Sequence, residues 1–189
     1  MAETPERLIS VRIAKAHAWV LHATEDLQED ALRSQVGPRA PSIRFHLWHI
    51  ARWADKVQAG LPTLTPALRR LGPAEEIWAV EGLAARWGLT ASRLGEGETG
   101  MGLDDAVAAA LPLPARDALL GYARRAFGAV EERASLLGTA DLVAPCTDLY
   151  GGANVVGDVL LSHLTHVSRH LGMIEALRGV QGMHGTATW

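Results

Sequence analysis

Apolar side chains recur at helical spacing in four long segments of this chain, and glycine and proline residues separate the segments. The second segment shows the pattern clearly between Ser42 and a stop at Gly60-Leu61-Pro62, where apolar residues follow steps of four and three. These residues are Ile43, Leu47, Ile50, Ala54 and Val57. Such steps return a side chain to the same face of an α-helix, so the pattern predicts an amphipathic helix.

The other three segments carry helix signals at their ends. They cover about 5–32, 114–137 and 153–178. Thr4 is an expected N-cap with Pro5 at the first helical position, a placement that suits the fixed backbone of proline. Gly179 is the expected C′ glycine of the last helix.

Composition and breaker residues together predict an all-α fold. The chain has 31 alanines and 26 leucines against 19 isoleucines and valines combined, a balance that favours helix over sheet. Glycines and prolines interrupt residues 61–113 except for an expected short helix over 74–86, which indicates a long crossover or lid. We therefore predict a single domain, 1–189, folded as a four-helix bundle with this crossover between its second and third helices.

Charge, hydropathy and cysteine content argue against nucleic-acid binding, membrane insertion and secretion. The 21 acidic and 18 basic residues are scattered, so the chain lacks the basic patch of a nucleic-acid-binding protein. No apolar run approaches the ~20 residues that span a bilayer, and the first residues lack a secretory signal pattern. Cys146 is the sole cysteine, so no internal disulfide forms, and we expect a cytoplasmic protein in which this thiol is inert.

Five of the eight histidines fall in two short windows. His46 and His49 lie in the second segment, and His163, His166 and His170 lie in the fourth. The latter three share one helical stripe with apolar residues, namely Val155, Val159, Met173, Ile174 and Leu177. The imidazoles are therefore predicted to point into the core, where each needs a hydrogen-bond partner and where like charges oppose protonation.

A metal ion would organise these buried imidazoles. His166 and His170 are spaced i and i+4, with Cβ atoms roughly 5–6 Å apart, and ligand bonds of ~2.0–2.1 Å let one ion bridge them. A third histidine would complete three protein ligands and leave positions open for water or substrate, as in catalytic sites. Either His46 or His49 can serve, and periodicity favours His46, which lies nearer the centre of its apolar stripe.

Two parts of the chain resemble the DinB-like superfamily of metal-binding four-helix bundles. They are SIRFHLWHIARWAD over 42–55 and HVSRHLGMIEALRG over 166–179. The family pattern takes one histidine from the second helix and an H-x-x-x-H pair from the last, which implies His49, His166 and His170 as the ligands. The chain departs from that pattern in Met173, where many members have glutamine, and in its additional His46 and His163.

The leading hypothesis is a mononuclear metal enzyme that activates a thiol or a water molecule. The resemblance implies thiol transfer from a low-molecular-weight thiol such as mycothiol, bacillithiol or glutathione, or a hydrolase or isomerase reaction. Imidazole ligands suit zinc or nickel, with iron as a further candidate, and disfavour magnesium and calcium. Arg52, Arg169 and the lid are the candidates to grip an acidic cosubstrate.

The competing hypothesis is a non-catalytic helical bundle that serves as a binding or dimerisation module. Its histidines would then be core residues or ligands of a structural metal. A bundle this apolar is also compatible with a homodimer formed through a helix face. The chain lacks H-E-x-x-H and E-x-x-H, which argues against a zincin protease and a carboxylate-bridged di-iron site.

The remaining polar and aromatic residues receive simpler interpretations. His163 is expected to be a core residue that supports the ligands, His17 and His22 to be solvated or at the core edge, and His184 to be on the surface. Trp53 is the tryptophan expected near the site, and the G-x-G-x-x-G sequence at 95–100 is expected to be a flexible loop. Three carboxylates could orient a ligand ring, although a surface ion pair is the default for each: Asp55, Asp158 and Glu175.

Overall fold

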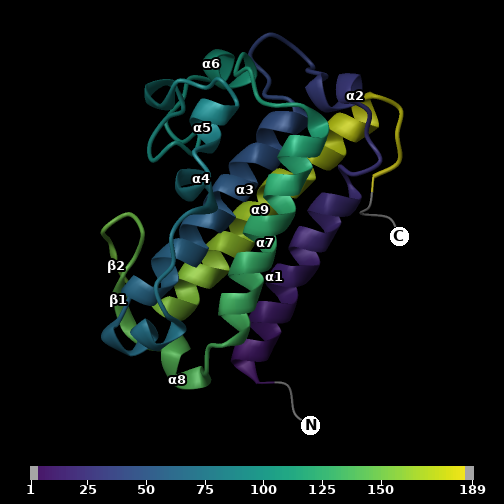
Figure 1. Ribbon diagram of the computed structural model, residues 1–189. Coiled ribbons are helices and arrows are strands. Elements are labelled where there is room, and N and C mark those ends of the chain that lie inside the picture. The colour runs from purple at the N-terminus through teal and green to yellow at the C-terminus, as the bar shows by residue number, and fades with distance from the viewer. Residues whose placement is uncertain (1–3, 186–189) are drawn as a thin grey trace.

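The computed structural model describes residues 4–185, so the predicted domain extends beyond them at both ends. Its four longest helices lie side by side (Figure 1). They are α1 (Pro5–His22), α3 (Ile43–Gly60), α7 (Arg116–Ser135) and α9 (Val156–Val180). Both α1 and α3 pack against α7 and α9. The all-α prediction is confirmed, with one short hairpin as the strand content of these residues, and none of their helices is long and apolar enough to span a membrane.

Helix α3 begins where the sequence predicts and is buried on every side. The Ser42 hydroxyl accepts a hydrogen bond from the Phe45 backbone N–H, as expected of an N-cap. Every residue from Ile43 to Asp55 is buried, polar ones included. The reason is that α7 and α9 cover two faces while the chain after Gly60 covers another. Polar side chains on α3 must therefore find partners inside the protein.

Helix α1 is shorter than the predicted segment. It ends at His22, and a separate short helix α2 (Glu29–Arg33) follows, so the predicted continuous helix to about Leu32 is wrong. The interruption has a tertiary cause, because Arg178 on α9 donates to the Ala23 carbonyl at 2.9 Å and to the Asp26 carboxylate at 2.8 Å. These hydrogen bonds stabilise a turn at a point where the local sequence pattern favours a continued helix.

Helix α9 is displaced at both ends from its predicted bounds. It begins at Val156, because Ala153–Val155 forms strand β2, paired antiparallel with β1 (Pro145–Thr147). It ends at Val180, and the positive-φ glycine beyond it is Gly182 rather than the expected Gly179. The Gly182 N–H donates to the Gly179 carbonyl at 3.0 Å, which closes the helix one turn later.

The long connection between α3 and α7 contains only short helices. They are η1 (Leu61–Thr63), η2 (Pro66–Leu71), α4 (Ile77–Val80), α5 (Leu83–Arg86), η3 (Ala91–Arg93) and α6 (Asp105–Ala109); the remaining short helix, α8 (Thr139–Leu142), follows α7. The single helix predicted over 74–86 is wrong, because Gly82 takes a left-handed conformation between α4 and α5. Helix α7 agrees with its predicted bounds to within two residues at each end.

Asp55 joins this connection to the helices. Its buried carboxylate accepts hydrogen bonds from the backbone N–H groups of Ile77 and Trp78, at 2.9 and 2.8 Å, and from the hydroxyl of Tyr122 at 3.0 Å. Gln58 and Arg52 donate to the same group. Asp55 is thus neither the surface ion pair nor the histidine-orienting group that the sequence suggested. Its carboxylate holds α4 and α7 on α3.

We expect Asp55→Asn to lower the free energy of unfolding by about 3–5 kcal/mol, the range for breaking a buried, paired charge. The amide would present N–H donors toward backbone N–H groups and would leave Arg52 without its buried counter-ion. Urea unfolding followed by circular dichroism measures the effect. The matched control is Asp30→Asn on the exposed surface of α2, expected within ~0.5 kcal/mol of wild type; equal losses in both variants would contradict the assigned role.

Candidate metal centre

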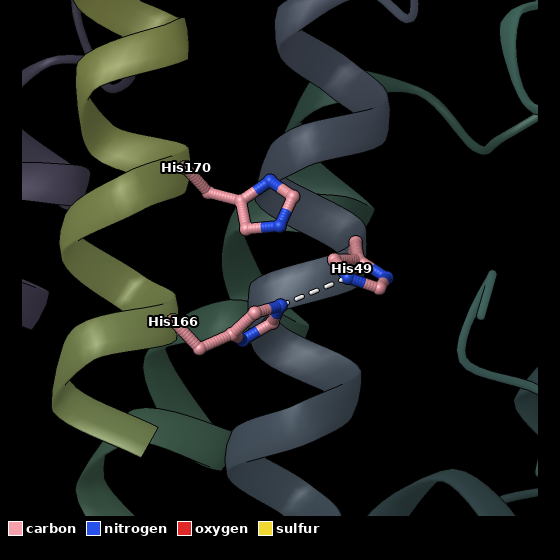
Figure 2. A group of neighbouring side chains, drawn as sticks. All are labelled: His49, His166 and His170. Carbon is pink, nitrogen blue, oxygen red and sulfur yellow. Dashed lines mark hydrogen bonds between the residues drawn. The ribbon is translucent and has the colours of Figure 1, made fainter. Parts of the chain in front are cut away.

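Three imidazoles from two helices converge in the interior. His49 projects from α3, and His166 and His170 project from consecutive turns of α9 toward it (Figure 2). Ring centroids are 4.8 Å apart for His49 and His166, 4.7 Å for His49 and His170, and 4.5 Å for His166 and His170. One ligand atom from each ring lies within 4.8 Å of the others, so within residues 4–185 this trio can hold a metal ion.

The tautomer of His49 follows from its hydrogen bond to the crossover. Its Nδ1 lies 2.5 Å from the backbone carbonyl oxygen of Thr99. A carbonyl only accepts, so Nδ1 carries the proton and Nε2 presents a lone pair. That Nε2 lies 2.9 Å from Nε2 of His166. Nitrogens bound to one ion by bonds of ~2.0–2.1 Å stand at about this separation, so the pair fits a shared ion.

The segment 95–100 is a loop, as expected from its glycines, and it holds His49 in place. Thr99 is fully buried, and the backbone carbonyls of Gly97 and Glu98 accept hydrogen bonds from Arg52. Gly100 has φ of +89°, and a Cβ there would lie 2.9 Å from the Trp48 ring and 3.2 Å from Nδ1 of His49. The glycine spacing therefore serves a close backbone approach to α3.

His46 lies behind the trio. Its Nδ1 is 2.9 Å from Nδ1 of His170, so one of these nitrogens donates to the other. The contact occupies Nδ1 of His170 and leaves its Nε2 for an ion. Periodicity favoured His46 over His49 as the third ligand, but the structure brings His49 into the trio and gives His46 the position of an orienting partner.

Burial keeps these imidazoles neutral. Desolvation, followed by the proximity of other histidines, lowers the pKa of His166 to about 3 and that of His170 to about 2. The same causes lower the pKa of His46 to about 4. Desolvation also lowers the pKa of His49, against the opposing hydrogen bond to Thr99. Neutral imidazole is the form that ligates metals, so the donor set suits a transition-metal ion.

A cavity of about 430 Å³ opens beside His166. Trp53 and Tyr150 line it, with ring centroids 5.3 Å apart, and the Trp53 ring lies 6.0 Å from that of His166. Trp53 therefore lies near the site as expected. Tyr150 comes from the turn between β1 and β2 and was missed, although Gly151-Gly152 after it is a turn signal that could have indicated a hairpin.

The two candidate arginines differ in their availability. Arg169 is exposed and lines the cavity beside His166. Arg52 is 1% exposed, and its guanidinium makes five hydrogen bonds to protein acceptors. These acceptors are Asp55, Glu76, Tyr122 and the carbonyls of Gly97 and Glu98. The structure does not support the expectation that Arg52 grips a cosubstrate, because no donor remains.

Other expected residues are placed as follows. His163 is buried in the core, as predicted. His17 is also buried, at 1% exposure, so the expectation that it is solvated or at the core edge is wrong. His22 and His184 are exposed. Cys146 lies in β1, where desolvation and then the nearby Asp148 and Asp158 raise the pKa of its thiol, in keeping with an inert residue.

Asp158 and Met173 on α9 depart from the positions that the sequence suggested. Asp158 is exposed and accepts a hydrogen bond from Asn154 rather than from a histidine ring. Met173 is 42% exposed, so the predicted inward stripe does not include it. Glu175 is half-buried on the same helix. The inward-facing stripe of α9 is thus narrower than the spacing of its apolar residues predicted.

Comparisons with known proteins identify the family and the fold. A sequence model of the DinB superfamily matches residues 12–174. The fold is similar to a crystal structure of a conserved protein from Enterococcus faecalis, with a TM-score of 0.73 over 94% of this chain and 96% of that one, at 15% identity. No match to a curated protein was found.

Gly100→Ala should destabilise the protein more than Gly102→Ala. Both positions have positive φ, so both variants lose about 1–2 kcal/mol to backbone strain. A methyl group at Gly100 additionally meets Trp48 and Phe45 within 3.0 Å, whereas at Gly102 the nearest atom is 3.6 Å away. We expect a further ~1–3 kcal/mol from this overpacking. Equal unfolding midpoints in urea would contradict the packed arrangement of 95–100.

Acid should destabilise the metal-free protein below about pH 6.5. The folded pKa values of His46, His166 and His170 lie below the unfolded value of 6.5, so the unfolded chain binds more protons and stability falls as pH falls. The contribution of these imidazoles to stability is complete above pH 6.5 and is lost as the pH falls toward their folded pKa values. Between pH 7.5 and 5 we expect a loss on the order of 1–2 kcal/mol per imidazole, measured by urea unfolding at each pH. A free energy of unfolding that does not change over this range would contradict the lowered pKa values of these imidazoles.

Proposed function

The chain belongs to the DinB superfamily, and on this premise we propose that it is a mononuclear metal-dependent enzyme whose ion is held by His49, His166 and His170. The observation that carries the proposal is the convergence of three neutral imidazoles, the buried His49 and the half-buried His166 and His170, beside an open cavity. Three protein ligands leave positions for small molecules, as catalytic metal sites do. Zinc or nickel fits this donor set best, and iron is a further candidate.

The side chains around the trio prepare it for this role. The Thr99 carbonyl fixes the His49 tautomer so that Nε2 is free of a proton. His46 contacts Nδ1 of His170 and so orients that ring. When bound, such an ion lowers the pKa of a water molecule or a thiol so that an anionic nucleophile is available near neutral pH.

The cavity supports a small-molecule substrate and a thiol or water nucleophile. Trp53 and Tyr150 give it apolar walls, and Arg169 brings an exposed guanidinium next to His166. An arginine in this position suits a carboxylate on a cosubstrate. We propose thiol transfer or hydrolysis as the reaction, with a low-molecular-weight thiol as the nucleophile in the first case. A cytoplasmic location and a homodimer remain predictions.

Metal content tests the ligand set. We expect about one equivalent of zinc, nickel or iron in tag-free wild-type protein and less than ~0.1 equivalent in His166→Ala and His170→Ala, because loss of one of three ligands removes most of the affinity. Inductively coupled plasma mass spectrometry gives the content, and circular dichroism verifies folding. The matched control His184→Ala, on the surface, should retain the metal. Metal-free wild-type protein that also fails to bind added zinc would refute the proposal.

Thiol-coupled turnover tests catalysis separately from binding. Wild-type protein with zinc or nickel should accelerate transfer of glutathione, mycothiol or bacillithiol to a panel of electrophiles, and a chelator should abolish the acceleration. The chelated protein should stay folded, because its core is formed by the packed helices. Unfolding on chelation without any turnover would instead favour the structural-metal alternative.

A further inference from the structure

Three polar side chains form a continuous hydrogen-bonded chain across the helices. Glu131 lies on α7, His17 on α1 and His163 on α9, and α1 packs against both of the other helices (Figure 1). Nδ1 of His17 is 2.7 Å from Oε1 of Glu131, and Nε2 of His17 is 3.1 Å from Nε2 of His163. Both histidines are buried, whereas the Glu131 side chain is 32% exposed. One end of the chain therefore reaches solvent.

Hydrogen-bond chemistry assigns the protons along this chain. A carboxylate accepts, so Nδ1 of His17 is the protonated nitrogen and its Nε2 has a lone pair. His163 must then donate from Nε2, which leaves its Nδ1 with a lone pair. Desolvation lowers the pKa of both imidazoles, so both are neutral. The chain thus has one direction of donation, from His163 toward Glu131.

The inner end of the chain is an unused acceptor. Nδ1 of His163 is buried and has no hydrogen-bond partner among the described residues. His163 also lines the cavity beside His166, one helical turn from the proposed metal ligand. A buried acceptor without a donor costs about 1–3 kcal/mol, so a purely structural network would gain stability from a partner here or from an apolar residue.

We propose that His163, His17 and Glu131 relay a proton between the cavity and solvent. This inference rests on the proposed function, because activation of a thiol or water releases the proton that the relay carries. The S–H or O–H bond of the nucleophile breaks and its proton bonds to Nδ1 of His163. The proton on Nε2 of His163 passes to Nε2 of His17, and the proton on Nδ1 of His17 passes to the Glu131 carboxylate.

The relay is balanced in protons and charge. One proton enters at the cavity and one leaves at Glu131, while each imidazole stays neutral and exchanges its tautomer. Transfer in the reverse direction returns a proton to the leaving group and restores the first tautomers. The His17 ring is stacked on Phe127, with centroids 4.2 Å apart and an interplanar angle of 5°. This packing holds both of its nitrogens in line with their partners.

The tautomers are testable without any metal or substrate. Nitrogen-15 spectra of the full-length, metal-free protein should show His17 protonated at Nδ1 and His163 protonated at Nε2 at pH 7.5. Variants His17→Gln and His163→Gln assign the two sets of signals. The opposite tautomer at either ring would overturn the relay, because the direction of donation would then be broken.

Proton release tests the transfer itself. Zinc-loaded protein is mixed with the probe thiol 2-mercaptoethanol in weakly buffered solution, and phenol red reports the proton released to solvent in stopped flow. In Glu131→Gln the amide oxygen still accepts from His17 but takes up no proton, so we expect release to slow about a hundredfold, as for loss of a general base. His17→Gln interrupts the chain at its centre and should show the same delay. The control Glu132→Gln removes a neighbouring exposed carboxylate and should match wild type.

The outcomes separate the relay from the metal site. Release at wild-type rate in Glu131→Gln and His17→Gln would overturn the relay and leave the metal proposal intact. Acceleration of the slow variants by added imidazole buffer would support the relay, since a small base replaces the missing acceptor. Failure of zinc-loaded wild-type protein to release a proton on thiol addition would overturn the proposed function, and the relay with it.

Discussion

Helix α3 has no solvent face, and this constraint determines much of the structure around it. A buried polar group without a partner costs several kcal/mol, so a polar residue on α3 gains stability from a partner on another element. Asp55 is satisfied by α4 and α7, Arg52 by the segment 95–100 and Glu76, and His49 by Thr99. The helix therefore fixes the position of a crossover that contains no long helix of its own.

The same constraint couples the candidate site to the crossover. Arg52 and His49 lie one turn apart on α3 and donate hydrogen bonds to the backbone of the same short segment. The carbonyls of Gly97 and Glu98 accept from Arg52, and that of Thr99 accepts from His49. Movement of this segment would remove two of the five hydrogen bonds of the buried Arg52 guanidinium and the bond that fixes the His49 tautomer. The orientation of His49 thus depends on packing as well as on its own helix, as is common for ligands oriented by a surrounding shell.

Sequence periodicity predicted the elements that depend on local signals. The start of α3 near Ser42, the bounds of α7 and the inward placement of His166 and His170 all follow from residues within one or two turns. The end of α1 and the hairpin before α9 depend on distant contacts, such as the bonds from Arg178 to Ala23 and Asp26. Local propensity contains no information about such contacts, so the predicted segments were too long there.

Periodicity alone does not distinguish His46 from His49 as the third ligand. An apolar stripe identifies the inward face only when another face meets solvent, and α3 is buried all round. Position on the stripe therefore cannot separate the two histidines. The two histidines differ in the partners of their ring nitrogens. Nδ1 of His49 donates to Thr99, which leaves Nε2 facing His166, whereas Nδ1 of His46 contacts His170. The family pattern points to the same histidine, a choice that the spacing of apolar residues does not contain.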